Sequence, residues 1–186
     1  MKMKALKILY FIEGTGGGAV THVLDLANLL PRDRMQTLLI FFLNGPSVKK
    51  AEELNLDYKL IPWKFPFDFT LIWRLRQIIK AEAIDIVHTH TITGNFYSRI
   101  ACLLSPIPVI SITTVHSFLV DELKGTNRMT FKDLLRYKRE RYTSCLTDHF
   151  VAVSNALQNK MVQDSIPQQK MLGSVLSQPT RNSSVQ

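Results

Sequence analysis

Short hydrophobic segments alternate with segments of helical periodicity along almost the whole chain, and this alternation constrains the fold more than any other feature. Several of the hydrophobic segments are continuously apolar, as strands are when helices cover both faces of a sheet. We predict strands at about 6–13, 36–43, 57–61, 84–89, 108–115 and 149–153. We predict helices at about 19–30, 47–55, 70–82, 93–104, 130–146 and 154–164. This order predicts an α/β fold, with a doubly wound, mostly parallel sheet and helices on both faces.

The length of 186 residues suits one domain with a substantial core. We expect this domain to span 1–176, with a short strand at 171–176, because the chain becomes polar and unpatterned from Ser177. Residues 177–186 are therefore predicted to be a disordered tail.

Two cysteines give no disulfide framework and suit a reducing, cytosolic compartment. No run approaches the ~18 apolar residues of a membrane span.

In a doubly wound sheet, ligands bind outside the carboxyl ends of the strands. Three chemically suggestive segments come directly after predicted strands: the glycine loop Gly14–Gly18, the segment His88–His90, and His116. We therefore expect these segments, although distant in sequence, to lie at one rim of the sheet.

The glycine loop Gly14-Thr-Gly16-Gly17-Gly18-Ala19 joins a strand to a helix. Glycines let the backbone approach a phosphate closely, and a helix N-terminus points free N–H groups at it. The loop also fits the dinucleotide fingerprint G-x-G-x-x-G/A. That fingerprint expects an acid after the second strand, where this chain has Leu43-Asn44-Gly45-Pro46. An NAD(P)-binding oxidoreductase is therefore a weaker alternative, and a glycine turn without a ligand is also open.

The histidines permit several interpretations. His88 and His90 alternate along a strand and can share a face, where two imidazoles can bind zinc. A third ligand would have to be His116 or an acid, and no such motif is visible, so we expect no metal and prefer hydrogen-bonding or structural roles. His116, just past a buried strand, can donate to a sugar or phosphate oxygen or shuttle a proton. A loop histidine without a role is its simpler interpretation.

The net charge of +8 favours anionic partners. Arg128, Lys132, Arg136 and Arg139 recur at helical spacing, which predicts a basic stripe that contacts an anionic membrane or an anionic acceptor, or else a solvated helix face. No nucleic-acid-binding motif accompanies the charge. The motifs G-x-S-x-G and Gly-Lys-Ser/Thr are both absent, which weakens hydrolase and NTPase interpretations.

Five segments in order resemble family 4 glycosyltransferases over about residues 5–171. They are the glycine loop with Gly17–Ala27, the strand Asp85–His90, Thr114-Val115-His116, the run Thr147–Asn155, and Ile166–Met171. The resemblance implies the GT-B architecture, in which two Rossmann-like domains face each other across a cleft. The N-terminal domain mostly holds the acceptor, and the other mostly holds a nucleotide-diphosphate sugar, of the UDP or GDP type. Transfer proceeds with retention and needs no metal or other cofactor.

The resemblance also implies roles for individual residues. Gly16, Gly17 and Gly18 would contact the donor diphosphate, and His116 would be the catalytic-site histidine that hydrogen-bonds the donor sugar. His90, Thr91, Gly94 and Asn95 would line the acceptor side.

After Lys170-Met171 the family usually continues through an Asn-Gly hinge into the donor-binding domain, whereas 172–186 here is unrelated. We therefore expect a C-terminal domain to be absent, through truncation, a frameshift or separate encoding of the second half, and the chain alone to be weakly active or inactive. The expected role is in polysaccharide biosynthesis, with a saccharide or lipid-linked acceptor, in the cytoplasm and peripherally on the inner membrane face. The alternative is a non-catalytic remnant that binds a membrane or a partner.

Overall fold

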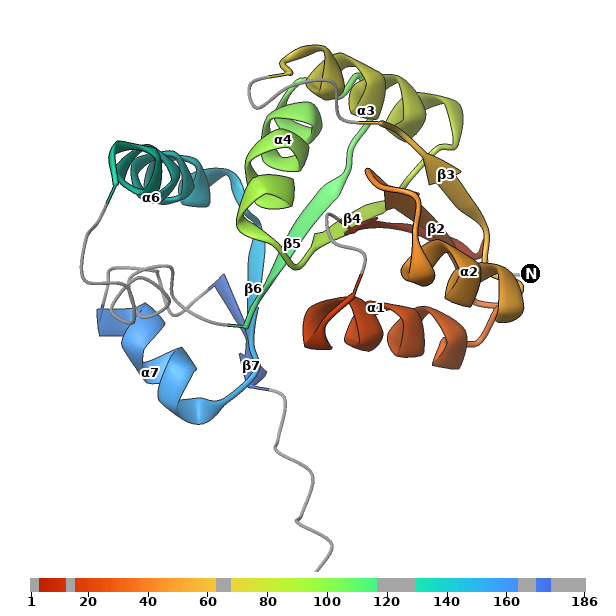
Figure 1. Cartoon of the computed structure of the whole chain (residues 1–186), viewed down its shortest axis with the longest axis horizontal. Coiled ribbons are helices and arrows are strands. Elements are labelled where there is room, and N and C mark those ends of the chain that lie inside the picture. The colour runs from red at the N-terminus through yellow and green to blue at the C-terminus, as the bar shows by residue number, and fades with distance from the viewer. Residues whose placement is uncertain (1–3, 13–15, 63–67, 117–129, 164–169, 175–186) are drawn as a thin grey trace, which may run out of the picture.

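Seven parallel strands form a single sheet in the computed structural model, which describes residues 4–12, 16–62, 68–116, 130–163 and 170–174 (Figure 1). The strands are β1 (Leu6–Ile12), β2 (Met35–Phe41), β3 (Tyr58–Leu60), β4 (Ile86–Thr89), β5 (Ile110–Val115), β6 (His149–Ala152) and β7 (Met171–Ser174). Their order is β3-β2-β1-β4-β5-β6-β7, and every neighbouring pair is parallel. The chain therefore reverses its direction across the sheet between β1 and β4, which is the switch point where such folds bind ligands.

Helices cover both faces of this sheet. They are α1 (Gly18–Leu29), α2 (Pro46–Glu53), α3 (Thr70–Ala81), α4 (Ile92–Leu103), α6 (Phe131–Thr143) and α7 (Asn155–Gln163), with a 3-10 turn, η1, at Ser144–Leu146. Figure 1 shows α1, α2 and α7 on one side of the sheet and α3, α4 and α6 on the other. The fold is thus three layers, helix on sheet on helix.

The alternation of side chains along β1 builds a core on each face. Tyr10 and Ile12 pack with the apolar side of α1 and α2, whereas Leu9 and Phe11 pack with that of α3 and α4. All four β1 side chains are buried. The uninterrupted run of buried apolar and aromatic residues from Ile8 to Ile12 is therefore explained by two helix layers, as the sequence indicated.

The predicted elements agree with the structure to within three residues at their ends. The helix expected over 130–146 ends at Thr143, and η1 continues the chain to β6. The sheet is entirely parallel among the described strands, and the expected short strand near 171 is present as β7. Ser154 caps α7, since its Oγ accepts a hydrogen bond from the Leu157 N–H at 3.2 Å. Gly14, Arg128 and the tail 177–186 lie outside the described residues.

Candidate functional site

The glycine loop opens α1 at the rim, just past the end of β1. Gly16, Gly17 and Gly18 are exposed, and a Cβ built on any of them would meet no atom of the described residues within 4 Å. Gly17 is the N-cap of α1 with φ 101°, a left-handed conformation that favours glycine. Within the described part of the chain, no side chain caps this helix. Among the described residues, the first N–H groups of α1 have no side-chain partner, which is the condition for binding a phosphate there.

The second segment of the rim follows β4 and starts α4. Thr91 is the N-cap of α4, and its Oγ1 accepts a hydrogen bond from the Gly94 N–H at 3.3 Å. Gly94 is buried, and a Cβ on it would lie 2.6 Å from Cδ1 of Phe11 and 2.8 Å from Oγ1 of Thr91. These two predicted acceptor-side residues thus have structural contacts: they begin α4 and let it approach β1 closely.

A cluster of four histidines occupies the rim between β1, α1, β4 and β5. Nδ1 of His90 lies 3.2 Å from Nε2 of His116. The ring centroid of His22, one helical turn into α1, is 5.7 Å from that of His90 and 5.8 Å from that of His116. The rings of His88 and His90 are 4.4 Å apart, so these two residues share a side as predicted. The glycine loop, His90 and His116 therefore meet at one rim.

Burial makes these imidazoles weak bases. Desolvation, with a smaller contribution from the neighbouring imidazoles, lowers the pKa of His88 to about 4 and that of His90 to about 2. Desolvation and the nearby His22 also lower the pKa of His116. The three side chains are consequently neutral at pH 7. A neutral His116 can either donate or accept one hydrogen bond to a ligand, depending on its tautomer.

Two contacts hold the base of this cluster. Nε2 of His88 lies 2.8 Å from Oγ1 of Thr114, on β5. The Tyr10 ring lies against both His88 and His90, at centroid distances of 5.3 and 6.0 Å, and burial raises the pKa of Tyr10 to about 12. Nε2 of His90 is buried and has no hydrogen-bond partner among the described residues. His90 is thus fixed on one side by His116 and carries a second nitrogen that a ligand or a water can satisfy.

Asn95, the last predicted acceptor-side residue, belongs to a buried polar network behind the rim. Its Nδ2 donates to Oε1 of Glu140 at 3.1 Å, and its buried Oδ1 has no hydrogen-bond partner among the described residues. The same Oε1 of Glu140 lies 2.9 Å from Nη2 of Arg99, whose side chain is fully buried. The network therefore joins α4, which carries Asn95 and Arg99, to α6, which carries Glu140.

The predicted basic stripe is divided by the structure. Lys132 and Arg136 are exposed on α6, whereas Arg139 is turned toward α4, with its guanidinium 4.5 Å above the Phe96 ring. Arg128 lies outside the described residues. Among the described residues, no group of three His, Cys, Asp or Glu side chains is arranged to hold a metal ion. No helix in the same part of the chain is long and apolar enough to cross a membrane.

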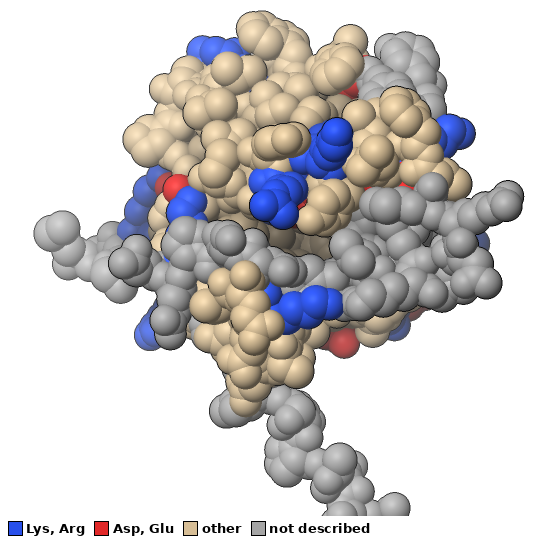
Figure 2. Space-filling view, turned by 90° about the vertical axis from the view of Figure 1, so that its left-hand side faces the viewer, with Lys and Arg blue, Asp and Glu red and all other residues tan. Residues whose placement is uncertain are grey.

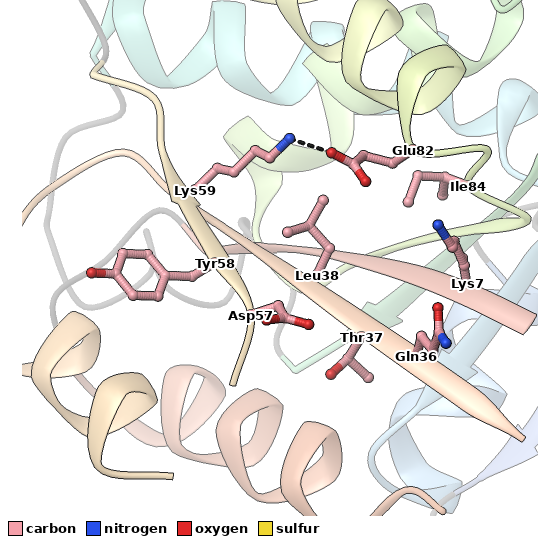
Figure 3. A pocket seen from close by; sticks show the side chains of 9 residues that line it. All are labelled: Lys7, Gln36, Thr37, Leu38, Asp57, Tyr58, Lys59, Glu82 and Ile84. Atoms are coloured by element: carbon pink, nitrogen blue, oxygen red, sulfur yellow. Dashed lines mark hydrogen bonds and ion pairs between the residues drawn. The ribbon is translucent and has the colours of Figure 1, made fainter. Parts of the chain in front are cut away.

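A hollow of about 270 Å³ lies away from the rim (Figure 3). Its walls come from the beginnings of β1, β2 and β3 and from the segment before β4, so it opens at the opposite end of the sheet. An ion pair between Lys59 and Glu82 spans it. None of the glycine-loop or histidine residues lines it, and it has no part in the candidate site.

Sequence reasoning missed three participants of the site: His22, Tyr10 and the Arg99–Glu140 pair. His22 had a usable signal, since it follows Gly18 by four residues and a helical turn brings it back toward the helix start. Arg99 also had one, because an arginine inside the apolar pattern of a predicted helix needs a buried partner. Tyr10 had no signal that separates it from other core residues.

Comparison with known proteins agrees with this geometry. Residues 16–171 match the family model described as Glycosyltransferase Family 4, and no curated protein matches the sequence. A glycosyltransferase from Rickettsia africae ESF-5 is 20% identical with a TM-score of 0.70, and the match covers 92% of this chain and 43% of that one. Anabaena Alr3699/HepE, solved in complex with UDP-glucose, is 19% identical with a TM-score of 0.68, covering 90% and 43%. A UDP-N-acetylglucosamine 2-epimerase is 14% identical with a TM-score of 0.64, covering 90% and 47%.

Identities this low show a shared fold only, and the chain spans less than half the length of each of these solved proteins. The family match is a different kind of finding, because it extends over most of the chain, from the glycine loop to the start of β7. The chain belongs to glycosyltransferase family 4 and has the fold of one domain of a GT-B enzyme.

Proposed function

We propose that this chain supplies the acceptor side, and one wall of the donor site, of a retaining glycosyltransferase. The reaction moves a sugar from a UDP- or GDP-sugar to a saccharide or lipid-linked acceptor. It requires a second domain of the GT-B type, which completes the donor site. The observation that carries the proposal is the meeting of an uncapped helix N-terminus with neutral imidazoles at one rim of the sheet. The rim offers backbone donors for phosphate oxygens beside side chains suited to sugar hydroxyls.

Gly16, Gly17 and Gly18 have the role of receiving the donor diphosphate. The leaving nucleoside diphosphate gains negative charge as the glycosidic bond to it breaks. The N-terminal end of a helix carries about half a positive charge, and its amides need no reorganisation to meet that charge. The open space over these glycines is what lets a diphosphate approach the backbone.

His116 has the role of hydrogen-bonding the donor sugar near the reacting carbon. Its Nε2 faces Nδ1 of His90, which leaves Nδ1 of His116 for the sugar. Because His116 is neutral at pH 7, it binds a hydroxyl group without adding a charge that would attract competing anions. The unpartnered Nε2 of His90 and Oδ1 of Asn95 are the groups we assign to the acceptor side.

Chemical-shift mapping of the isotopically labelled chain with UDP, GDP and their sugars tests this assignment. We expect UDP or GDP to shift the amide signals of the glycine loop, and the complete donor sugar to shift the imidazole signals of His116 as well. Gly17→Ala should abolish the amide shifts, because a Cβ there strains the backbone and covers the amides. Lys49→Gln, on the exposed side of α2, is the matched control and should leave them unchanged.

Transfer itself is measured with the second half of the enzyme supplied on a separate polypeptide. His116→Asn should then lower kcat, while Lys49→Gln should not. If a nucleotide sugar changes the chemical shifts of other residues but of neither Gly17 nor His116, the site assignment is wrong. Binding of NAD(P) at the glycine loop in place of UDP or GDP would favour the oxidoreductase alternative, and absence of transfer in every pairing would favour a non-catalytic role.

A further inference from the structure

Helix α6 is attached to the domain by its polar side. Glu140 and Thr143 both bond to the buried guanidinium of Arg99, on α4, and Arg139 lies over the Phe96 ring. No residue of α6 is buried. The helix therefore turns a charged and hydroxyl-bearing stripe toward α4, which is the reverse of what an amphipathic surface helix usually does.

The opposite side of α6 is apolar and exposed. We call Phe131, Leu134, Leu135 and Tyr142 the α6 apolar stripe. Their spacing places Phe131, Leu134 and Tyr142 on the side of the helix turned away from Glu140, while Leu135, four residues before Arg139, lies at the edge of the stripe toward α4. Phe131 is 80% exposed, Tyr142 is 73% exposed, and both leucines are 38% exposed. A stripe of this composition loses free energy in water and gains it when a partner covers it.

The charges around the stripe are mostly positive. The helix carries Lys132, Arg136, Lys138, Arg139 and Arg141. Its two acids are both engaged within the protein, since Asp133 forms the capping box with Thr130 and Glu140 pairs with Arg99. Figure 2, which looks at the side of the molecule where α6 lies, shows many more blue Lys and Arg side chains than red acidic ones. The partner must therefore offer an apolar interior and a negatively charged surface.

Helix α3, on the same layer and on the other side of α4, has the same character. Phe69, at its start, is 61% exposed, and Trp73 is 56% exposed with the Arg76 guanidinium 4.7 Å from its ring. Together with Phe131 and Tyr142, these are all the large exposed aromatic residues in the described part of the chain. In the opposite helix layer, α1 has no lysine or arginine. Exposed aromatic and basic side chains thus occur together on one layer of the molecule.

We propose that this layer docks on an anionic lipid bilayer, with the α6 apolar stripe entering the boundary between headgroups and acyl chains. Lys138 and Arg141, each seven residues after a residue of the stripe, then lie at the level of the lipid phosphates, where long basic side chains bury their stems and keep their charge in the headgroup region. A second copy of the chain fits less well, because it would bring a like-charged stripe into contact. Nucleic acid fits less well because Leu134 and Leu135, half of the stripe, are aliphatic and offer neither stacking nor hydrogen bonds to bases.

Docking in this way places the membrane beside the rim. Arg99 bonds to α6 and also to Oγ1 of Thr113, on β5, at 3.4 Å. His116 follows Thr113 by three residues, just past the end of that strand. A lipid-linked acceptor at the membrane surface would therefore reach the site over a short path. The docking itself is independent of the transfer reaction and is tested without any donor.

Vesicle flotation of the chain tests the proposal. We expect binding to vesicles of phosphatidylcholine with phosphatidylglycerol, weaker binding at high salt, and little binding to phosphatidylcholine alone. The double variant Phe131→Ser/Tyr142→Ser should bind about a hundredfold more weakly, since each buried ring is worth about tenfold. Leu29→Ser on α1, where the leucine is 79% exposed, is the matched control and should bind like the wild type.

The variants replace exposed side chains, and unchanged circular dichroism and unfolding curves will show that they fold. Failure of the wild type to float with anionic vesicles overturns the proposal, as does a double variant that binds as well as Leu29→Ser. Light scattering that shows a dimer lost in the double variant would assign the stripe to a second copy. Binding to RNA that requires Phe131 and Tyr142 would also overturn the membrane assignment. None of these results depends on whether a sugar is transferred.

Discussion

Removal of the Arg99 guanidinium should loosen α6 and cost a large part of the stability of the domain. The side chain is fully buried, and its N–H groups reach five acceptors. These are Oε1 and the backbone oxygen of Glu140, at 2.9 and 3.4 Å, and the hydroxyls of Thr147, Thr143 and Thr113, at 2.6, 3.2 and 3.4 Å. The guanidinium thus links α4 to α6, to β5 and to the residue that follows η1.

The magnitude follows from what Arg99→Met leaves behind. Breaking a buried ion pair by removing one partner typically costs 3–5 kcal/mol. Glu140 would keep its hydrogen bond from the Asn95 amide at 3.1 Å, and its side chain is 25% exposed. The hydroxyls of Thr113 and Thr147 remain 3.3 Å apart and can bond to each other. We therefore expect Arg99→Met to lower the free energy of unfolding by about 3 kcal/mol, at the lower end of that range.

Urea unfolding followed by circular dichroism measures this loss, with two comparisons. Lys50→Met removes one partner of the Lys50–Glu53 pair, whose side chains are 56% and 64% exposed, and should cost no more than about 1 kcal/mol. The double variant Arg99→Met/Glu140→Gln should cost less than the sum of its single variants, because it leaves no unpaired charge. A cost for Arg99→Met equal to that of Lys50→Met, or strictly additive single costs, would refute the account of the network.

Two further predictions concern the packing of α4 and the histidine cluster. Gly94→Ala should lower the free energy of unfolding by about 1–3 kcal/mol, because the new methyl group would overlap the Phe11 ring. Gly16→Ala, where the new methyl group meets no described atom within 4 Å, should cost little. Urea unfolding of both variants measures the difference. The free energy of unfolding should also fall below pH 6.5. There the histidines of the unfolded chain bind protons, whereas the buried imidazoles of His88 and His90 in the folded chain stay neutral. At pH 5 the loss of free energy of unfolding should approach about 4 kcal/mol for the two groups together. A free energy of unfolding that does not change between pH 7 and 5 would show that burial does not lower these pKa values.

The architecture could be predicted from the sequence because each of its signals is local. Continuously apolar strands, helical periodicity and the glycine loop all arise from residues within one element, and they placed the strands and helices within three residues of their positions. The meeting of the glycine loop with His90 and His116 also followed, because the fold class alone fixes where strands end.

The orientation of α6 could not be predicted in this way. Its sequence contains a basic stripe and an apolar stripe, and the usual rule turns the apolar stripe inward. What reverses the helix is a long-range contact, the bonding of Glu140 and Thr143 to Arg99 on α4, and no local pattern encodes that pairing. Gly94 shows the same limit, since its role depends on the Phe11 ring 83 positions earlier in the chain.

Among the described residues, the lysines and arginines lie apart from the candidate donor site, and this separation sets the affinity that these residues give the site. The rim groups described here are backbone amides and imidazoles, with no lysine or arginine among them, while the exposed basic residues of α6 lie on the helix layer beyond α4. A helix N-terminus carries only about half a charge, whereas a nucleoside diphosphate carries at least two. We therefore expect the chain alone to bind UDP or GDP with a Kd of about 1 mM, equivalent to roughly 4 kcal/mol. Calorimetry or the shift titration measures this value, and the addition of a second half that carries cationic side chains should tighten binding. Micromolar binding by the chain alone, unchanged by the second half, would mean that this rim already holds the positive charge for the diphosphate.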